Sequence, residues 1–467
     1  MAVRDVDAGK RDQASPPFNG YRTREIPPPD PYLTQVGPGT PMGEFMRRFW
    51  QPVCLSEELT DLPKAIRILG EDLVAFRDKS GNVGVLHRHC SHRGTSLEYG
   101  IVSEQGIRCC YHGWLFDVDG TILETPGEPP DSKLKDSLYH GAYPAQEYKG
   151  IVHAYLGPPE MRPHFPEYDL FDVPGAKYAP FSFSYENNWL QSHENAVDPV
   201  HSVFLHQRIT EHFVDPFSVL PHLTWQFTGD GSGLLYTAKR RVDEDTIWVR
   251  ILHTLMPSSV FIPSTWDLGD APLYYQRALY IRHLVPVDDE NFTFFGWRVH
   301  GDEFPGGFPE KNRPGMIDMD GQTKRDIDYE EIQRAPDDWQ AQGSQYGGIA
   351  VHQRDHLGST DGGVAMMRRG LRNILDGNAP AAWPKPASEE PDGPKIRNVY
   401  AFDSLLQIKE LPDPDADWEM IADLGKELTA AVIEIGDSLD DQAERDRQTR
   451  ARTKEIELEY QARYKTN

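Results

Sequence analysis

Two short loops in the first quarter of the chain each carry one cysteine and one histidine that can bind metal. The first loop reads Cys90-Ser91-His92, and the second reads Cys109-Cys110-Tyr111-His112 after sixteen intervening residues. A glycine comes shortly after each histidine, at Gly94 and Gly113. Glycine permits tight turns that aim backbone N–H groups inward, toward a bound sulfur. The pattern therefore predicts two loops that fold around one shared metal group.

The donors in these loops are those of a Rieske [2Fe–2S] centre, in which two cysteines bind one iron and two histidines bind the other. A structural zinc site also uses two cysteines and two histidines, but zinc fingers usually pair cysteine with cysteine and histidine with histidine. Here each loop holds one of each, which favours the cluster and therefore electron transfer. The predicted cluster ligands are Cys90, His92, Cys109 and His112.

The four cysteines of the chain fit a reducing compartment better than a disulfide framework, so we expect a cytoplasmic protein. Only Cys109 stands three residues before His112, which leaves Cys110 beside a ligand but outside the required spacing. Cys54 is expected to be a small buried hydrophobic residue.

Composition excludes several other classes of protein. With 467 residues, of which 38% are hydrophobic and 11% aromatic, the chain is long enough for two or three globular domains. A formal net charge of −25 opposes nucleic-acid binding, which needs basic patches to displace phosphate counterions. The chain has no apolar run of about eighteen residues and no apolar stretch near its N-terminus. We therefore expect neither membrane insertion nor export.

The chain is predicted to have three parts, residues 1–41, 42–160 and 161–467. The first part is polar and proline-rich, as in an extended arm. The second contains short strand candidates such as AIRILGEDLVAFRD and GIVHAYLGPP between Gly, Asp and Asn turn signals. It is predicted to be an all-β module with the cysteine–histidine loops at one tip. A proline-rich linker, PPEMRPHFPEYDLFDVP, leads into the third part.

The third part is predicted to combine helices with an antiparallel sheet, which makes the fold class α+β. It begins with a helical segment, NNWLQSHENAVDPVHSVFLHQR. Four later runs have the length and turn spacing of antiparallel strands: WQFTGDGSGLLYTAKRRV, TIWVRILHTLMPSSVFIP, LYYQRALYIRHLVPV and NFTFFGWRVH. The C-terminal stretch SLDDQAERDRQTRARTKEIELEYQARYK has opposite charges three or four residues apart, typical of a solvated helix or a packing arm.

A second candidate metal site lies at the start of this third part. His201 and His206 are five residues apart, and Asp198 stands three residues before His201. On a helix Asp198 and His201 share a face, whereas His206 reaches the same side only if the helix bends or ends. Pro199 suits a first helical turn. Two imidazoles and one carboxylate on one face of an iron leave positions open for O2 and substrate.

A carboxylate from elsewhere must complete this set of iron ligands. The helix-prone stretch Asp337-Asp338-Trp339 offers the best candidates. The residues alone do not decide between Asp337 and Asp338.

The loops CSHRG and CCYHGW and the run ENxxDPxHxxxxH resemble the oxygenase component of the Rieske non-haem iron oxygenases. The resemblance is to the phthalate dioxygenase-like group, which includes O-demethylases of methoxylated biphenyls, and it extends from residue 37 to the HLGSTD segment at residue 356. It implies a helix-grip-like catalytic domain and a third iron ligand in a D-x-x-x-Q segment. Asp338 and Gln342 match that segment, with one extra residue before Ile349. We therefore assign Asp338, with Asp337 as the alternative.

The resemblance also implies a head-to-tail homotrimer, in which the cluster of one subunit faces the mononuclear iron of the next. Asp198 would bridge the two centres, accepting hydrogen bonds from His112 of the neighbouring subunit and from His201 of its own. Asn195 is expected to support this site. A helix N-terminal position would by itself favour an aspartate such as Asp198, which is the structural alternative.

The implied function is oxygenation of an aromatic, carboxylated compound by hydroxylation or O-demethylation with O2. A separate NAD(P)H-dependent reductase would supply electrons, because the chain lacks a GxGxxG-bearing βαβ unit and a ferredoxin cysteine set. A Rieske electron carrier without oxygenase turnover is the alternative, but a carrier needs no second metal. Candidate clamps for a substrate carboxylate are Arg208, Arg250, Arg282 and Arg298.

Overall fold

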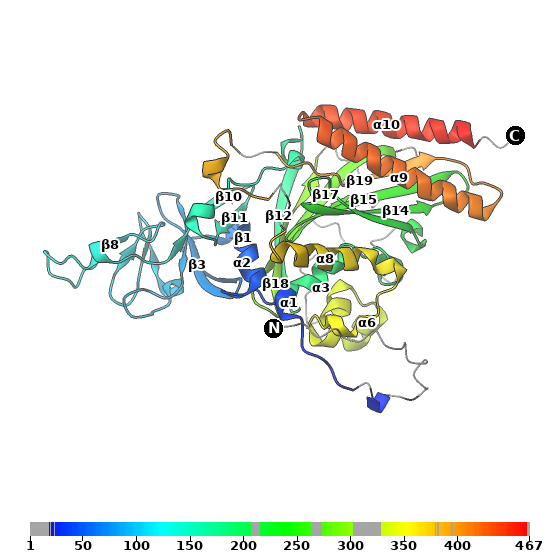
Figure 1. Ribbon diagram of the computed structural model, residues 1–467. Coiled ribbons are helices and arrows are strands. Elements are labelled where there is room, and N and C mark those ends of the chain that lie inside the picture. The colour runs from blue at the N-terminus through cyan, green and yellow to red at the C-terminus, as the bar shows by residue number, and fades with distance from the viewer. Residues whose placement is uncertain are drawn as a thin grey trace.

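The computed structural model describes residues 18, 20–22, 24–206, 215–263, 273–301, 328–378, 380, 383–393 and 396–464. Within these residues an N-terminal β module is followed by a large antiparallel sheet with helices on both faces (Figure 1). The predicted α+β class is confirmed.

The N-terminal module contains three small antiparallel sheets, with strand orders β1-β11-β10, β2-β3-β4-β9 and β5-β6-β7-β8. The strands are β1 Trp50–Leu55, β2 Lys64–Ile68, β3 Glu71–Arg77, β4 Val83–His87, β5 Ile101–Val102, β6 Ile107–Arg108, β7 Leu115–Phe116, β8 Ile122–Glu124, β9 Ala142–Tyr143, β10 Ala145–Tyr148 and β11 Ile151–Tyr155. Cys90 and Cys109 lie in the hydrophobic core of this module, with Val74, Phe76 and Trp114. The two loops are thus anchored by a core that packs around their cysteines.

Two short helices, α1 (Pro31–Thr34) and α2 (Pro41–Met46), precede the first strand. Each begins at a favourable N-cap. The Asp30 side chain accepts a hydrogen bond from the backbone N–H of Tyr32, and the Thr40 side chain accepts one from the backbone N–H of Gly43. Leu33 is completely buried. The last part of the predicted arm 1–41 is therefore packed rather than extended.

The large sheet has the strand order β12-β18-β17-β16-β15-β14-β13, and β19 pairs with both β15 and β17. Its strands are β12 Lys177–Tyr185, β13 His222–Phe227, β14 Gly233–Arg241, β15 Thr246–Leu255, β16 Ser259–Pro263, β17 Leu273–Pro286, β18 Phe292–His300 and β19 Phe402–Gln407. All neighbouring pairs are antiparallel. The four predicted strand runs became β13 to β18, whereas β12 and β19 were not predicted.

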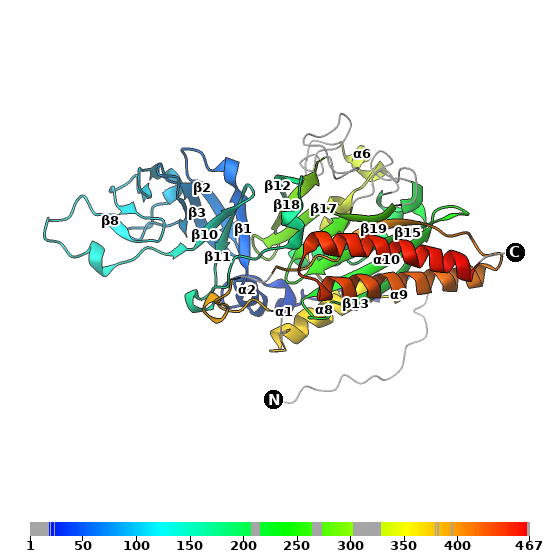
Figure 2. The same ribbon diagram turned by 90° about the horizontal axis from the view of Figure 1, so that it is seen from above.

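Helices cover both faces of this sheet (Figures 1 and 2). The helices are α3 Trp189–Asn195, α4 His201–Phe204, α6 Tyr329–Arg334, α7 Asp338–Gly343, α8 Gly362–Leu375, α9 Pro414–Ser438 and α10 Gln442–Arg463. In Figure 1 the α9–α10 pair lies above the sheet, and α3 and α8 lie below it. The predicted antiparallel sheet covered by helices is confirmed. Among the described helices, none is long and apolar enough to cross a lipid bilayer.

Buried ion pairs attach the two C-terminal helices to the sheet and the linker. Arg445 on α10 donates to Asp169 of the linker at 3.0 Å, and both side chains are nearly fully buried. Arg241 on β14 donates to Asp417 on α9 at 2.6 and 2.8 Å. The charged C-terminal stretch is therefore a packing element.

Candidate metal centres

The two cysteine–histidine loops meet at one site. Cys90 and Cys109 are each 3% exposed, and the rings of His92 and His112 lie with their centroids 4.6 Å apart. Trp114 stacks on the His92 ring at 4.6 Å and 2°. The His92 Nδ1 atom is buried and has no hydrogen-bond partner among the described residues. Two adjacent thiols beside two adjacent imidazoles fit the donor set of a Rieske cluster.

Both loops turn at glycines, as predicted. Gly94 has a φ of +76° and Gly113 one of +75°, which is the left-handed region that glycine enters without strain. Burial raises the pKa of the Cys90 thiol to about 11, although backbone hydrogen bonds from His92 and Arg93 oppose this shift. These N–H groups are the donors that the loop sequence was expected to aim at a sulfur. Cys54 is buried, as predicted, and Cys110 is exposed.

The two loops are not built like a site for one small ion. Among the described residues, one group of three possible ligand atoms lies within 4.8 Å of one another, and it consists of His201, His206 and Asp338. The cysteine–histidine loops do not form such a group. A zinc ion needs its four ligands around a single centre, whereas a two-iron cluster separates the cysteine pair from the histidine pair.

A helix break brings the two histidines of the second centre together. The predicted helical segment is divided into α3, capped by the Asn188 side chain, and the short α4 that begins at His201. Pro199 does not occupy the first turn of α4 as expected, because Val200 is the N-cap residue. Since α4 ends at Phe204, His206 turns back beside His201, with ring centroids 5.1 Å apart. The break supplies the bend that the five-residue spacing requires.

Asp338, the first residue of α7, completes this group. Its Oδ1 atom lies 3.8 Å from His201 Nε2 and 3.6 Å from His206 Nε2. Asp337 approaches the opposite side of the His206 ring, with its Oδ1 atom 3.5 Å from Nδ1. Asp337 also caps α7, because its side chain accepts from the backbone N–H of Asp338 at 2.8 Å. The two aspartates therefore occupy different positions around the same imidazole.

Hydrogen bonds from helix α3 hold Asp338 and helix α7 in place. Asn195 Nδ2 donates to Asp338 Oδ1 at 3.2 Å, and the Ser192 hydroxyl donates to Gln342 Oε1. Burial opposes ionisation of Asp338, but His206, His201, Arg282 and the Asn195 hydrogen bond together lower its pKa below the usual value. An ionised carboxylate facing two imidazoles fits a divalent metal ion.

Asp198 lies directly before the histidines. His201 Nδ1 forms a hydrogen bond with the Asp198 backbone carbonyl, and the Asp198 carboxylate lies 3.9 Å from the same nitrogen. That carboxylate also accepts from the backbone N–H of Val200 at 3.1 Å. Within one chain the β5–β8 sheet of the cluster module and helix α3 lie in separate parts of the molecule (Figure 1).

An aromatic wall faces the His-His-Asp group from the large sheet. Phe181 and Tyr280 stack at 4.9 Å and 4°, and Tyr185 packs edge-on against Phe294 at 5.3 Å. Burial raises the pKa of Tyr185 well above its usual value, and the charge of Asp338 adds to this effect. These residues come from β12, β17 and β18, and no local sequence pattern marks them as neighbours.

The four candidate arginines have different surroundings. Arg282 lies over the rings of Tyr280 and Phe294, at 5.0 and 5.2 Å from their centroids, and its buried Nε atom has no hydrogen-bond partner among the described residues. Arg250 already binds Asp403 through Nε and Nη2, at 2.9 and 2.8 Å. Arg298 lies over the Phe181 ring, and Arg208 falls outside the described residues. Arg282 is the arginine whose charge reaches Asp338.

The fold and its two centres define an iron-dependent oxidoreductase with a Rieske cluster. Residues 49–145 match the family model described as the Rieske [2Fe-2S] domain. The chain is 45% identical to the tert-butanol monooxygenase / tert-amyl alcohol desaturase oxygenase subunit of Aquincola tertiaricarbonis, over 89% of this chain and 92% of that protein. It is 39% identical to the phenoxybenzoate dioxygenase subunit alpha of Ectopseudomonas oleovorans, over 74% of this chain and 85% of that protein.

Among solved structures, Pseudomonas putida CBB5 NdmB has a TM-score of 0.55, at 20% identity over 74% of this chain and 94% of that one. This likeness concerns the fold. The sequence relatives show that the chain belongs to the Rieske non-haem iron oxygenases, as an oxygenase (alpha) subunit. Its cofactors are a Rieske [2Fe–2S] cluster and a mononuclear non-haem iron. The alternative of an electron carrier without oxygenase turnover is not supported.

Proposed function

We propose that His201, His206 and Asp338 bind the mononuclear iron, with Asp337 and Asn195 supporting them. The observation that carries this assignment is the convergence of both histidine Nε2 atoms on one carboxylate oxygen of Asp338. The cluster is assigned to the four loop residues Cys90, His92, Cys109 and His112. When bound, the iron supplies activation of O2 at the positions that three protein ligands leave open, and the cluster supplies single electrons.

The protein groups around the iron site orient the substrate and keep water away. Tyr185 and Phe294 are each 3% exposed, and Arg282 provides a cation beside this apolar wall. A guanidinium can bind a carboxylate through two parallel hydrogen bonds, and an aromatic ring packs well against aromatic side chains. These features support an aromatic, carboxylated substrate, which would be hydroxylated or O-demethylated.

A tertiary alcohol is a second candidate substrate. The relative that is 45% identical over 89% of this chain is named for tert-butanol and tert-amyl alcohol, which carry neither ring nor carboxylate. Such a substrate would leave Arg282 without a ligand partner. An aromatic carboxylate would therefore need the positive charge of Arg282, whereas a tertiary alcohol would not.

The resemblance to the family supports a proposal for the quaternary structure and the electron source. We propose a cytoplasmic head-to-tail homotrimer in which Asp198 connects His112 of one subunit with His201 of the next. The separation of the two centres within one chain supports transfer between chains. Electrons would come from a separate NAD(P)H-dependent reductase, and no role in nucleic-acid or membrane binding is proposed.

Product analysis by mass spectrometry tests the reaction. Reduced, iron-replete protein would be mixed with O2 and with three kinds of compound: carboxylated aromatics, their uncharged methyl esters and tertiary alcohols. Turnover of the acids in preference to their esters supports the proposed substrate class. A gain of two oxygens and two hydrogens identifies a dioxygenase, whereas formaldehyde release identifies O-demethylation. Turnover of tertiary alcohols alone would overturn the aromatic assignment.

A further inference from the structure

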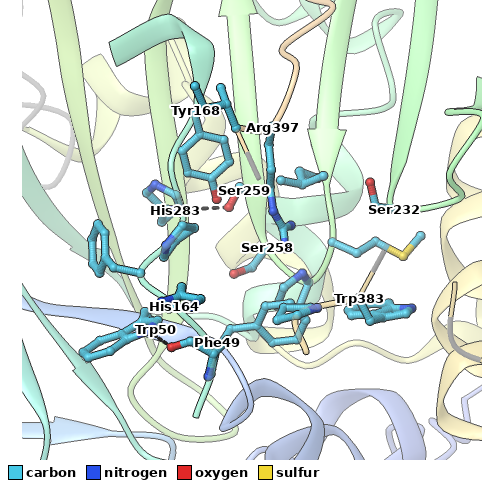
Figure 3. A pocket seen from close by; sticks show the side chains of 18 of the residues that line it. Phe49, Trp50, His164, Tyr168, Ser232, Ser258, Ser259, His283, Trp383 and Arg397 are labelled. Atoms are coloured by element: carbon cyan, nitrogen blue, oxygen red, sulfur yellow. Dashed lines mark hydrogen bonds between the residues drawn. The ribbon is translucent and has the colours of Figure 1, made fainter. Parts of the chain in front are cut away.

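A cavity of about 570 Å³ lies on the side of the large sheet opposite to the iron site. It is bounded by β1, the linker around residues 163–171, the sheet and the loop around residues 383–400 (Figure 3). Successive side chains of a strand point to opposite faces. On β17, the charge of Arg282 acts on Asp338, whereas the adjacent His283 lines the cavity. The cavity is therefore separate from the catalytic face.

One wall of the cavity is aromatic. Figure 3 shows Phe49, Trp50 and Trp383 along this wall. Phe49 and Trp383 meet edge-on at 5.2 Å, and all three rings keep some accessible surface. The volume of the cavity is within the range of about 300–1,000 Å³ that is usual for small-molecule sites. This wall therefore suits a planar aromatic ring.

The backbone places Arg397 on the other side of the cavity, beside Tyr168 (Figure 3). The two residues form an isolated parallel β-bridge. In it the Arg397 N–H donates to the Glu167 carbonyl at 2.9 Å, and the Asp169 N–H donates to the Arg397 carbonyl at 3.1 Å. Residues paired across such a bridge project to the same side. Since Tyr168 lines the cavity, the bridge directs Arg397 to it as well.

The charge of Arg397 reaches the hydroxyl groups of this side. Burial raises the pKa of Tyr168, whereas the charge of Arg397 and a hydrogen bond with Ser259 oppose this shift. Ser259 also forms a 2.8 Å hydrogen bond with His283 Nδ1, and the neighbouring Ser258 lines the cavity too. A guanidinium beside hydroxyl groups suits a carboxylate, whose two oxygens accept hydrogen bonds.

Arg397 has no counter-charge in the part of the chain that the structure describes. It is half-buried, and its guanidinium forms neither an ion pair nor a hydrogen bond with another described residue. The acidic residues of the lining, Asp230, Asp437 and Glu390, have no carboxylate oxygen within 4.0 Å of it. Burial and the charges of Asp437 and Asp230 raise the pKa of Tyr400, so these two acids lie around that residue instead. The guanidinium is therefore available to an anion in the cavity.

We propose that this cavity is a second small-molecule site, which binds an aromatic monocarboxylate. The carboxylate would form two parallel hydrogen bonds with the guanidinium of Arg397, and the ring would pack against Phe49, Trp50 and Trp383. All of these residues lie on the side of the sheet away from the iron site. The proposal therefore does not depend on the substrate that the catalytic centre accepts.

The test uses 4-bromobenzoate and the iron-replete protein. Anomalous scattering from soaked crystals should place bromine among Phe49, Trp50 and Trp383, with the carboxylate at Arg397. Calorimetric titration should show saturable binding, and 4-bromobenzamide, an uncharged analogue of the same shape, should bind about tenfold more weakly. Arg397→Met should abolish the bromine peak in the cavity. Arg397→Lys keeps the charge but not the paired donors, and should retain a weaker peak.

Lys385→Met is the matched control. Lys385 also lines the cavity but is exposed, so the loss of its charge should leave the cavity peak and the affinity unchanged. Bromine beside the iron ligands alone, an unchanged cavity peak in Arg397→Met, equal affinity for the benzoate and the benzamide, or binding at crystal concentration only would each overturn the proposal. A second peak beside the iron would report on the catalytic centre, because only the cavity peak should depend on Arg397.

Discussion

At the scale of single residues, the two adjacent aspartates at the start of α7 occupy different positions. Asp338 faces the Nε2 atoms of both histidines, and Asp337 faces His206 Nδ1 and caps the helix. Sequence spacing alone left both residues as candidates and the family resemblance favoured Asp338, whereas the direction of α7 relative to the imidazoles gives the two carboxylates different positions. The D-x-x-x-Q pattern also acquires a physical meaning, because Gln342 ties α7 to Ser192 of α3.

Substituting each aspartate separately tests this difference. Asp338→Ala should remove the mononuclear iron, so that iron analysis falls from about three to about two atoms per chain while the cluster spectrum stays unchanged. Asp337→Asn keeps the size of the capping side chain and should retain the iron. It should lower turnover about tenfold to a hundredfold, as for other partners of metal-bound histidines. Loss of iron in Asp337→Asn with full iron in Asp338→Ala would reverse the assignment.

The role proposed for Asp198 is in electron transfer rather than in metal binding. Its backbone carbonyl already accepts from His201, so Asp198→Asn leaves that contact intact. We expect both metals to remain and turnover to fall about tenfold to a hundredfold. Rapid mixing of reduced protein with substrate and O2 should show slow re-oxidation of the cluster. Full turnover in this variant would show that the carboxylate does not connect the centres.

At the scale of secondary structure, buried ion pairs hold the C-terminal helices to the rest of the chain. Arg445→Ala would leave the buried carboxylate of Asp169 without the guanidinium of its ion pair and with the backbone N–H of Val399 as its hydrogen-bond donor, which should cost about 3–5 kcal/mol of stability. Arg447, two residues further along α10, pairs with Glu444 at the surface. Arg447→Ala should therefore leave the melting temperature unchanged. Equal melting temperatures for the two variants would show that the Arg445 pair does not stabilise the helix.

Much of the element order could be predicted, and the omissions have identifiable causes. The runs that became β14, β15, β17 and β18 contain many β-branched and aromatic residues. Strand β19 is short, follows a proline-rich loop and pairs with strands that lie more than a hundred residues earlier. Its position depends on these distant partners. Helix α9 was also not predicted, although Leu424, Leu428 and Val432 recur every four residues along its buried face.

At the scale of the whole molecule, the proposed electron path crosses between chains. Cys109→Ser should disable the cluster, and Asp338→Ala should disable the iron site, so each variant alone should be inactive. Co-expressed chains would form mixed trimers in which an intact cluster faces an intact iron site. A substantial fraction of turnover should return in the purified mixed protein. If electrons instead passed within one chain, the mixture would remain inactive.

Acid should destabilise the molecule through its buried neutral histidines. Burial lowers the pKa of His153 and His193 to about 3, and of His253 and His283 to about 4. Below a pH of about 6.5 the unfolded chain takes up protons that these folded imidazoles do not. Stability should therefore be greatest above that pH and fall as the pH drops from about 6.5 to about 4, by about 1.4 kcal/mol per pH unit for each such group.

Melting temperatures between pH 7.5 and 5 would measure this dependence. His193→Leu removes one of the titrating groups without touching a bonded nitrogen, since neither of its ring nitrogens has a partner among the described residues. Its curve should be flatter than that of the parent protein. A parent melting temperature that is independent of pH over this range would rule out the buried histidines as the cause.

The position of β19 constrains how this protein can be made in the cell. The strand pairs with both β15 and β17, and Asp403 within it binds Arg250 of β15. The cluster module does not contain β19. It can fold while the chain is still on the ribosome, since domains fold as units and N-terminal ones emerge first. The large sheet stays incomplete until residue 407 has been synthesised. During this interval the unpaired edges of β15 and β17 are exposed, and we expect chaperones to bind the nascent chain there.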